Sequence, residues 1–406
     1  MVSSILKMFI MKKLYFIITL LSITFSTIQA QDSLWIRKYQ FNFYNQYDLR
    51  NSSSNAIATN RVLTDLFRKE VKSKMNEKVG NVAYGIFSFS TTYLTMLWSH
   101  EFGHALRAKQ VGGYFKFHNA ALPIPYTTMH LPSTVNLTDE SLSVTAGFEV
   151  NYLNVRNIQQ EFILQNGIYN EDLAFSFANR LMYSIYASLI VPINPTEPSV
   201  WINTAGDPVH VALPVFKNFS NNKVFMPDST VNPQLVSYYN QSSLLASFFN
   251  LLDPQFYREL GAAFGKNKTR RPIFIIGDYE NGWTYGTLFN VSPLGYELYL
   301  NNYIHFNSNK FSVYFKYGNP FKNNGMGVVW NDILNTSKYR LMGNIDVWDQ
   351  DLFGFGIAGE FSLESKLSNH FATSISTGYK TDGYVLGKQI NQGFNLGLGL
   401  VYYANY

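Results

Sequence analysis

The stretch FNLGLGLVYYANY, residues 394–406, alternates apolar side chains with glycine and asparagine. Successive side chains of a β-strand point to opposite faces, so a period of two predicts a strand with one apolar face. Leu396 and Leu398 would lie on that face, and Gly397 and Gly399 on the other. The alternation therefore predicts a β-sheet at this end of the chain.

The same alternation extends back to residue 272. Segments of about ten residues, such as WTYGTLFNV, YELYLNNYIHF and YRLMGNIDVWD, repeat it between turn residues. Such segments, and the aromatic Tyr406 in register with their apolar face, are typical of outer-membrane β-barrels. We predict an antiparallel, outer-membrane barrel-like region over residues 272–406. A soluble antiparallel sheet with one buried face is the alternative.

The first segment of the chain predicts export. MKKLYFIITLLSITFSTIQAQD begins at Met11 with two lysines, continues through an apolar run and reaches polar residues after Ala30. This is the layout of a secretory signal peptide, here residues 1–30. We therefore expect the protein in the cell envelope of a Gram-negative bacterium, in the outer membrane, with the periplasm as the alternative. Residues 31–54 are expected to form a strand and the beginning of a polar linker, NSSSNAIATN.

The middle of the chain, residues 55–271, is predicted to be mainly helical. Val62, Leu66 and Val71 are among the apolar residues that recur at helical spacing between charged residues. Residues 79–99 carry no charge, which fits either a transmembrane helix or a buried core helix. The predicted fold class is thus α+β and membrane-associated, with a helical region followed by an antiparallel β-region.

The amino-acid composition argues against some classes of function. The net charge of +5 and a charged fraction of 15% lack the concentrated basic face of a nucleic-acid binder, so we expect no nucleic-acid partner. Aromatic residues make up 17% of the chain, which suits a protein that contacts membrane interfaces. Because there is no cysteine, any metal ion must be bound by histidine, aspartate or glutamate. The oligomeric state stays open.

A metal site is indicated by LWSHEFGHALRAKQVGG, residues 97–113. On a helix, His100 and His104 project from one face and can share one ion, as in an HExxH motif. Glu101 lies one position further on, where its carboxylate can take a proton from water activated by zinc. The motif therefore predicts Zn²⁺ bound by two histidines, with Glu101 as the general base of a hydrolase.

The motif and its surroundings resemble the site-2-protease-like intramembrane zinc metalloproteases. His100, Glu101, Gly103 and His104, with Ala108 and Gly112, match the pattern HExGHxxxAxxxG of that family. The segment TAGFEVNYL, residues 145–153, is similar to its GPxxN segment, and FFNLLDP, residues 248–254, to its Leu-Asp-Gly segment. The resemblance implies zinc-dependent peptide hydrolysis, with Asp253 as the third ligand. It covers about half of the chain, and Phe148 stands where the family has proline.

A second candidate for the third ligand comes from the residues themselves. Glu149 would lie on a helix among apolar residues, where a carboxylate needs a cation or hydrogen-bond donors. A glutamate from a later helix completes the site in one class of zinc peptidases. The alternative for Glu149 is an exposed helical glutamate, and for Asp253 a turn or helix-capping aspartate before Pro254. We favour Glu149 slightly.

These patterns predict an exported zinc metallopeptidase that hydrolyses a protein or peptide substrate and is tied to a membrane, expected to be the outer membrane. One alternative is a non-catalytic outer-membrane β-barrel protein, for transport or assembly, whose metal site is structural or vestigial. Another is an intramembrane protease of the inner membrane, against which the terminal strands argue.

Overall fold

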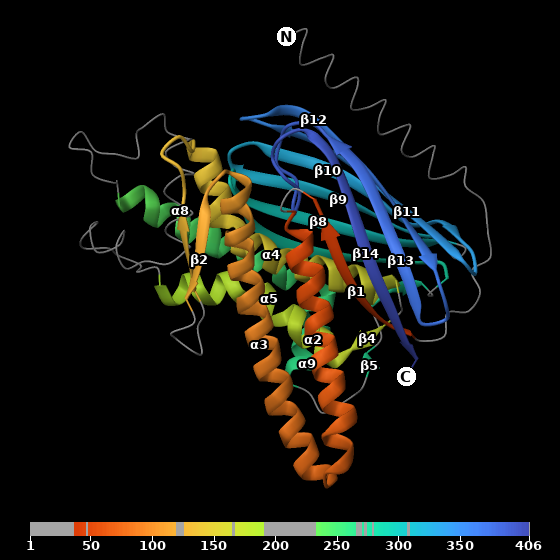
Figure 1. The fold of residues 1–406 in the computed structure, drawn as a ribbon. Helices are drawn as coiled ribbons and strands as arrows, with labels where there is room; N and C mark the ends of the chain where they lie inside the picture. The colour runs from red at the N-terminus through yellow and green to blue at the C-terminus, as the bar shows by residue number, and fades with distance from the viewer. Residues whose placement is uncertain are drawn as a thin grey trace.

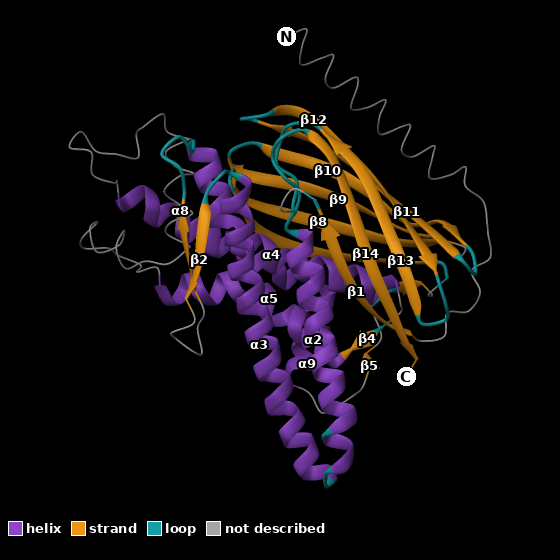
Figure 2. Cartoon of the chain, viewed as in Figure 1, coloured by secondary structure: helices purple, strands orange, loops and turns teal. Residues whose placement is uncertain are grey.

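The computed structural model describes residues 36–45, 48–118, 126–164, 167–190, 233–264, 270–271, 274–277, 280–306 and 309–405. The predicted signal peptide and Tyr406 lie outside these residues. Within them, six α-helices accompany a large antiparallel sheet, so the predicted α+β class is confirmed. Helices gather on one side of the sheet in Figures 1 and 2.

One sheet of ten strands forms the larger part of the fold. Its order is β1-β14-β13-β12-β11-β10-β9-β8-β7-β6, and every neighbouring pair is antiparallel. The strands are β1 (Ile36–Tyr44), β6 (Ile276–Gly277), β7 (Gly282–Ser292), β8 (Gly295–Phe306), β9 (Asn309–Pro320), β10 (Asn323–Asn335), β11 (Tyr339–Gln350), β12 (Gly354–Lys366), β13 (Phe371–Lys380) and β14 (Gly393–Asn405).

The predicted antiparallel region is confirmed, but the sheet is not a closed barrel. Strands β6 to β14 follow one another as neighbours, and β1 joins the far edge by pairing with β14, with Ile36 opposite Asn405. Strands β1 and β6 remain as two separate edges of the described sheet. The helices lie against one face of the sheet, which we call its inner side (Figure 2).

The helices come from the middle of the chain. They are α2 (Arg50–Glu70), α3 (Glu77–Gln110), α4 (Leu137–Leu164), α5 (Asn170–Ile190), α8 (Pro233–Ser247) and α9 (Pro254–Phe264), with short 3₁₀ turns at Lys72–Lys74 and Phe248–Leu252. Two small antiparallel pairs lie outside the large sheet: β2 (Tyr114–His118) with β3 (Tyr126–His130), and β4 (Ile168–Tyr169) with β5 (Arg270–Arg271). None of the described helices meets the length and hydropathy needed to cross a membrane.

The expected linker NSSSNAIATN is wrong, because these residues form the first turns of α2. Their polar side chains are satisfied by neighbouring elements. The Asn51 and Asn55 side-chain oxygens accept from backbone N–H groups of β1, and Ser52 Oγ donates to the Ser99 carbonyl of α3 at 3.0 Å. These tertiary contacts offset the low helix propensity of serine and asparagine. The polar side chains at the start of α2 therefore belong to its interface with β1.

The apolar core lies between the helices and the strands nearest to them. Phe148 of α4 and Tyr183 of α5 are fully buried and pack edge to face, with ring centroids 5.1 Å apart. Tyr183 in turn packs on Phe289 of β7, also at 5.1 Å. Buried leucine, valine and tyrosine side chains of β7 and β8 complete the same cluster. This core fixes the position of α4, against which α3 packs.

The two faces of the sheet have the reverse polarity of an ordinary soluble sheet. On β12, Ile357 and Phe361 are exposed, whereas Glu360 and Glu364 are buried. The outward apolar side chains recur on β14, where Leu398 is 54% exposed. Buried charges on the inner side are paired: Lys38 with Glu364, Arg50 with Glu360, Lys316 with Glu297 and Lys388 with Asp346. The predicted alternation is present, with its apolar side facing outward.

Candidate functional site

The HEFGH motif lies where α3 and α4 touch. A Cβ atom at Gly103 would lie 2.5 Å from the Ala146 carbonyl oxygen and 2.9 Å from Val150 Cγ2. Real contacts do not reach these distances, so a glycine is required at this crossing. The close approach brings both histidines of α3 against the backbone of α4, and both are 97% or more buried.

Each histidine ring is held through Nδ1. His100 Nδ1 lies 2.7 Å from Asn151 Oδ1, and His104 Nδ1 lies 2.9 Å from the Ser143 carbonyl oxygen. An amide or carbonyl oxygen only accepts hydrogen bonds, so Nδ1 of each neutral ring carries the proton. The lone pair of each imidazole is then on Nε2. This is the form and the outer contact that metal-binding histidines commonly show.

The two rings are close to one another. Their centroids are 4.9 Å apart, with planes at 76°. Phe148 packs edge to face on His100, with its centroid at 5.0 Å. The rings therefore share one buried environment on one face of α3, as the four-residue spacing predicts.

Gly147 lies against the His100 ring. A Cβ atom built there would be 2.4 Å from Nε2 and 2.5 Å from both Cδ2 and Cε1. Three nearly equal distances place that point over the ring face, because a point beyond the ring edge would be much further from the two carbons. Gly147 thus packs on the ring without lying along the in-plane Nε2 lone pair. Gly147 and Asn151, the two residues that carried the GPxxN resemblance, both contact His100.

Glu101 has a different environment from the histidines. It is partly exposed, on the side of α3 that carries the β2–β3 hairpin. Thr127 Oγ1 of β3 donates to the Glu101 carbonyl oxygen at 3.4 Å, and Phe117 of β2 packs on Trp98 and Phe102. Solvent therefore reaches Glu101, whereas both imidazoles are buried.

Glu149, the favoured third ligand, is engaged elsewhere. It is fully buried, so the alternative of an exposed helical glutamate is wrong. Its Oε1 accepts from Arg107 at 2.9 Å and from the Gly387 N–H at 2.6 Å. Burial raises the pKa of Glu149, although Arg107 and Gly387 oppose that effect. Arg107 also donates to the Lys388 carbonyl, so this pair connects α3 and α4 to the segment before β14.

Asp253 lies at a second buried ion pair. Its Oδ1 accepts from the Gln255 N–H at 2.8 Å, which makes it a turn aspartate at the start of α9. Its Oδ2 accepts from Gln159 at 2.6 Å and pairs with Arg180 at 3.1 Å. Burial raises the pKa of Asp253 to about 6, against the opposing charge of Arg180. Gln159 is eight residues beyond Asn151, roughly 12 Å along α4 at 1.5 Å per residue.

The described residues therefore bring together His100, His104, Gly147 and Asn151, and they bring neither carboxylate candidate to the histidines. No group of three His, Asp or Glu side chains able to hold a metal occurs in the part of the chain that the structure describes. The two imidazoles could supply two ligands of a zinc ion, with ring centroids 4.9 Å apart on one face of α3, and zinc binding stays a prediction. The third ligand stays a prediction.

Sequence analysis missed two contacts that organise the site. Ser143 contributes a backbone carbonyl, which no side-chain motif can reveal. Asn179 of α5 bonds to Asn151 and lies far from the motif in sequence. A polar residue inside the apolar run FANRLMYSIYASLI was the available signal for Asn179.

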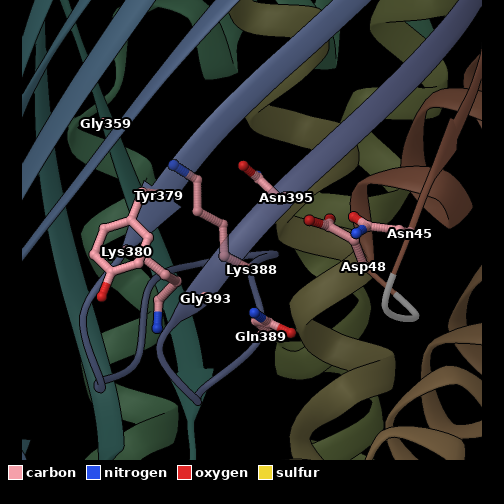
Figure 3. Close-up of a pocket in the computed structure, with 9 residues that line it drawn as sticks. All are labelled: Asn45, Asp48, Gly359, Tyr379, Lys380, Lys388, Gln389, Gly393 and Asn395. Atoms are coloured by element: carbon pink, nitrogen blue, oxygen red, sulfur yellow. The ribbon is translucent and has the colours of Figure 1, made fainter.

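A separate recess lies at the rim of the sheet (Figure 3). Lys380, Lys388, Asp48 and Asn395 are among the residues that line it. Lys380 Nζ donates to three backbone carbonyls, at 2.8, 2.9 and 2.6 Å, and Lys388 Nζ donates to Asn344 and Asp346. Protein oxygens therefore already engage the ammonium groups of both lysines.

Comparison with known proteins gives no relative. No family model, curated protein or solved structure matches the chain. The function has to be argued from the site and from the surface of the sheet.

Proposed function

We propose that this protein is an exported zinc-dependent metallopeptidase, held at the outer membrane of a Gram-negative bacterium by the apolar face of its sheet. The observation that carries the proposed activity is the pair of Nδ1 contacts. Asn151 Oδ1 and the Ser143 carbonyl leave His100 and His104 as Nδ1–H tautomers, whose Nε2 atoms would bind zinc. We assign no third protein ligand, because Glu149 and Asp253 are each paired with an arginine.

The residues of the HEFGH motif would have different roles in peptide hydrolysis. Zinc, when bound, supplies a Lewis acid that lowers the pKa of water to about 7 and polarises a carbonyl group. Glu101 would take a proton from the attacking water and return it to the nitrogen of the leaving amine. His100 and His104, both buried, would hold the zinc ion, and the β2–β3 hairpin contacts the backbone of α3 at Glu101.

The proposed activity is tested by metal content and by cleavage of an unfolded protein such as casein. Wild type is expected to hold about one zinc per chain, and His104→Ala to lose it. Glu101→Gln should retain zinc but lose hydrolysis by about 10²- to 10⁴-fold, the usual contribution of a general base. Glu77→Gln, at an exposed position of the same helix, is the matched control. A folded wild type that binds no zinc would exclude this function.

A second candidate is a non-catalytic outer-membrane protein, and the reversed polarity of the sheet favours it. Strands that contact lipid carry apolar side chains on their outer face and polar ones on their inner face. The sheet shows this arrangement, with Ile357, Phe361 and Leu398 exposed and paired charges on the inner face. In this case the histidines would be structural or vestigial.

Membrane contact is tested separately from catalysis. We expect the wild type in the outer-membrane fraction, with heat-modifiable migration on a gel. Ile357→Arg and Leu398→Arg should each weaken membrane insertion, by about 2 to 4 kcal/mol for a cation at the middle of a bilayer. Lys366→Glu, exposed at the end of β12, should not. Recovery of the folded wild type in a soluble fraction without detergent would exclude membrane contact.

A further inference from the structure

A chain of buried amide side chains extends behind His100. Asn151 Nδ2 donates to Asn179 Oδ1 at 2.8 Å, and Asn154 Nδ2 donates to the same oxygen at 2.9 Å. Asn179 Nδ2 donates to the Phe175 carbonyl of α5 at 2.8 Å. All three asparagines are fully buried, so each amide depends on these partners.

The direction of this chain follows from its far end. The Phe175 carbonyl can only accept, so Asn179 must turn its NH₂ group toward it and its oxygen toward α4. That oxygen can only accept from Asn151, so the NH₂ group of Asn151 faces Asn179. The oxygen of Asn151 is then left facing His100 Nδ1, at 2.7 Å. The orientation of the Asn179 amide thus fixes that of the Asn151 amide, and neither amide can be flipped while these hydrogen bonds are kept.

We propose that Asn179 is a positioning residue that acts through Asn151 to fix the tautomer of His100. This inference rests on the proposed zinc site, whose ligand nitrogen, Nε2 of His100, it would keep unprotonated. Without the Asn179 oxygen, nothing on α5 would prevent Asn151 from presenting its NH₂ group to His100 Nδ1. Nδ1 would then have to accept, the proton would move to Nε2, and that nitrogen could no longer bind a metal ion.

Asn154 provides a matched control within the same network. It is equally buried, donates to the same Asn179 oxygen, and also contacts Ser99 Oγ at 3.3 Å. Among the contacts of the described residues, none joins Asn154 to His100. Removing its side chain therefore perturbs the same buried region but leaves the chain from Phe175 through Asn179 and Asn151 intact.

The experiment measures the tautomer and the zinc affinity independently. Imidazole ¹⁵N chemical shifts of His100 would be recorded in the metal-free protein at alkaline pH, and zinc affinity by competition with a chromophoric chelator. Asn179→Ala is expected to populate the Nε2–H tautomer and to weaken zinc binding by about 10- to 100-fold. Asn154→Ala should leave both unchanged.

A conservative variant keeps the test informative if Asn179→Ala folds poorly. Asn179→Asp retains an oxygen that accepts from Asn151, so the Nδ1–H tautomer should persist. The proposal is overturned if Asn179→Ala keeps the Nδ1–H tautomer, or if Asn154→Ala changes tautomer and affinity as much. A wild type with the Nδ1–H tautomer but no zinc binding would defeat the proposed function and leave the role of Asn179 standing.

Discussion

Substitution of Gly147 by alanine is the sharpest test of the site geometry. The added Cβ would lie 2.4 Å from His100 Nε2, whereas carbon and nitrogen atoms in contact need about 3.4 Å. The ring or α4 must therefore move by about 1 Å. Metal-ligand distances tolerate deviations of only about 0.2 Å, so the ring can no longer direct Nε2 at the same point as His104.

We expect Gly147→Ala to lower zinc affinity by about 100-fold, the upper end of losses from a misplaced outer contact. Overpacking should cost a further 1 to 3 kcal/mol in the free energy of unfolding, roughly. The assays are chelator competition and urea denaturation. Gly85→Ala is the control, because a Cβ there meets nothing within 4 Å. It should stabilise α3 by about 1 kcal/mol and leave zinc affinity unchanged. Wild-type affinity and stability in Gly147→Ala would refute the described packing.

Two further predictions concern buried charges. Arg107→Leu should destabilise the fold by about 3 to 5 kcal/mol in urea denaturation, because Glu149 is left unpaired. The double variant with Glu149→Leu should recover much of this loss and still bind zinc; loss of zinc in the double variant would instead make Glu149 a ligand. For Asp172, burial alone would raise the pKa, but ion pairs with Arg37 and Arg61 outweigh it and hold the pKa below its usual 3.8. Its stabilising contribution is therefore present above about pH 4 and is lost as the pH falls further. Asp172→Asn should flatten the pH dependence of stability in that acidic range, and an unchanged acid profile would contradict the ion-pair geometry.

Local periodicity predicted much of the fold. The alternation of small and apolar residues in FNLGLGLVYY corresponds to β14, and the HEFGH spacing does place both histidines on one helical face. The outward apolar side chains of β12 and β14 agree with the barrel-like pattern of the strands, but the period alone did not predict which side the helices would cover. A period of two fixes which residues share a face but not what covers that face.

The linker prediction was wrong and the third ligand stays a prediction, and both concern side chains whose partners are distant in sequence. Asn51 and Asn55 suggested a linker because both are polar. Their hydrogen-bond partners lie on β1, and the sequence does not show that the chain turns back to bring α2 against this strand. Glu149 and Asp253 were candidates as ligands because a buried carboxylate needs a cation, and that argument cannot distinguish zinc from an arginine. Arg107 and Arg180 supply the positive charge in the structure.

The pairing of β1 with β14 has a consequence for how the chain reaches its folded state. Strand β1 is synthesised before every described helix, and its partner β14 comes after every other described strand. Contacts between such distant segments form slowly, because closing a long loop costs entropy before the contacts compensate for it. Until then β1 is an unpaired edge, able to pair with other chains. Protection of this one strand until β14 is synthesised is therefore the step on which the yield of folded protein should depend.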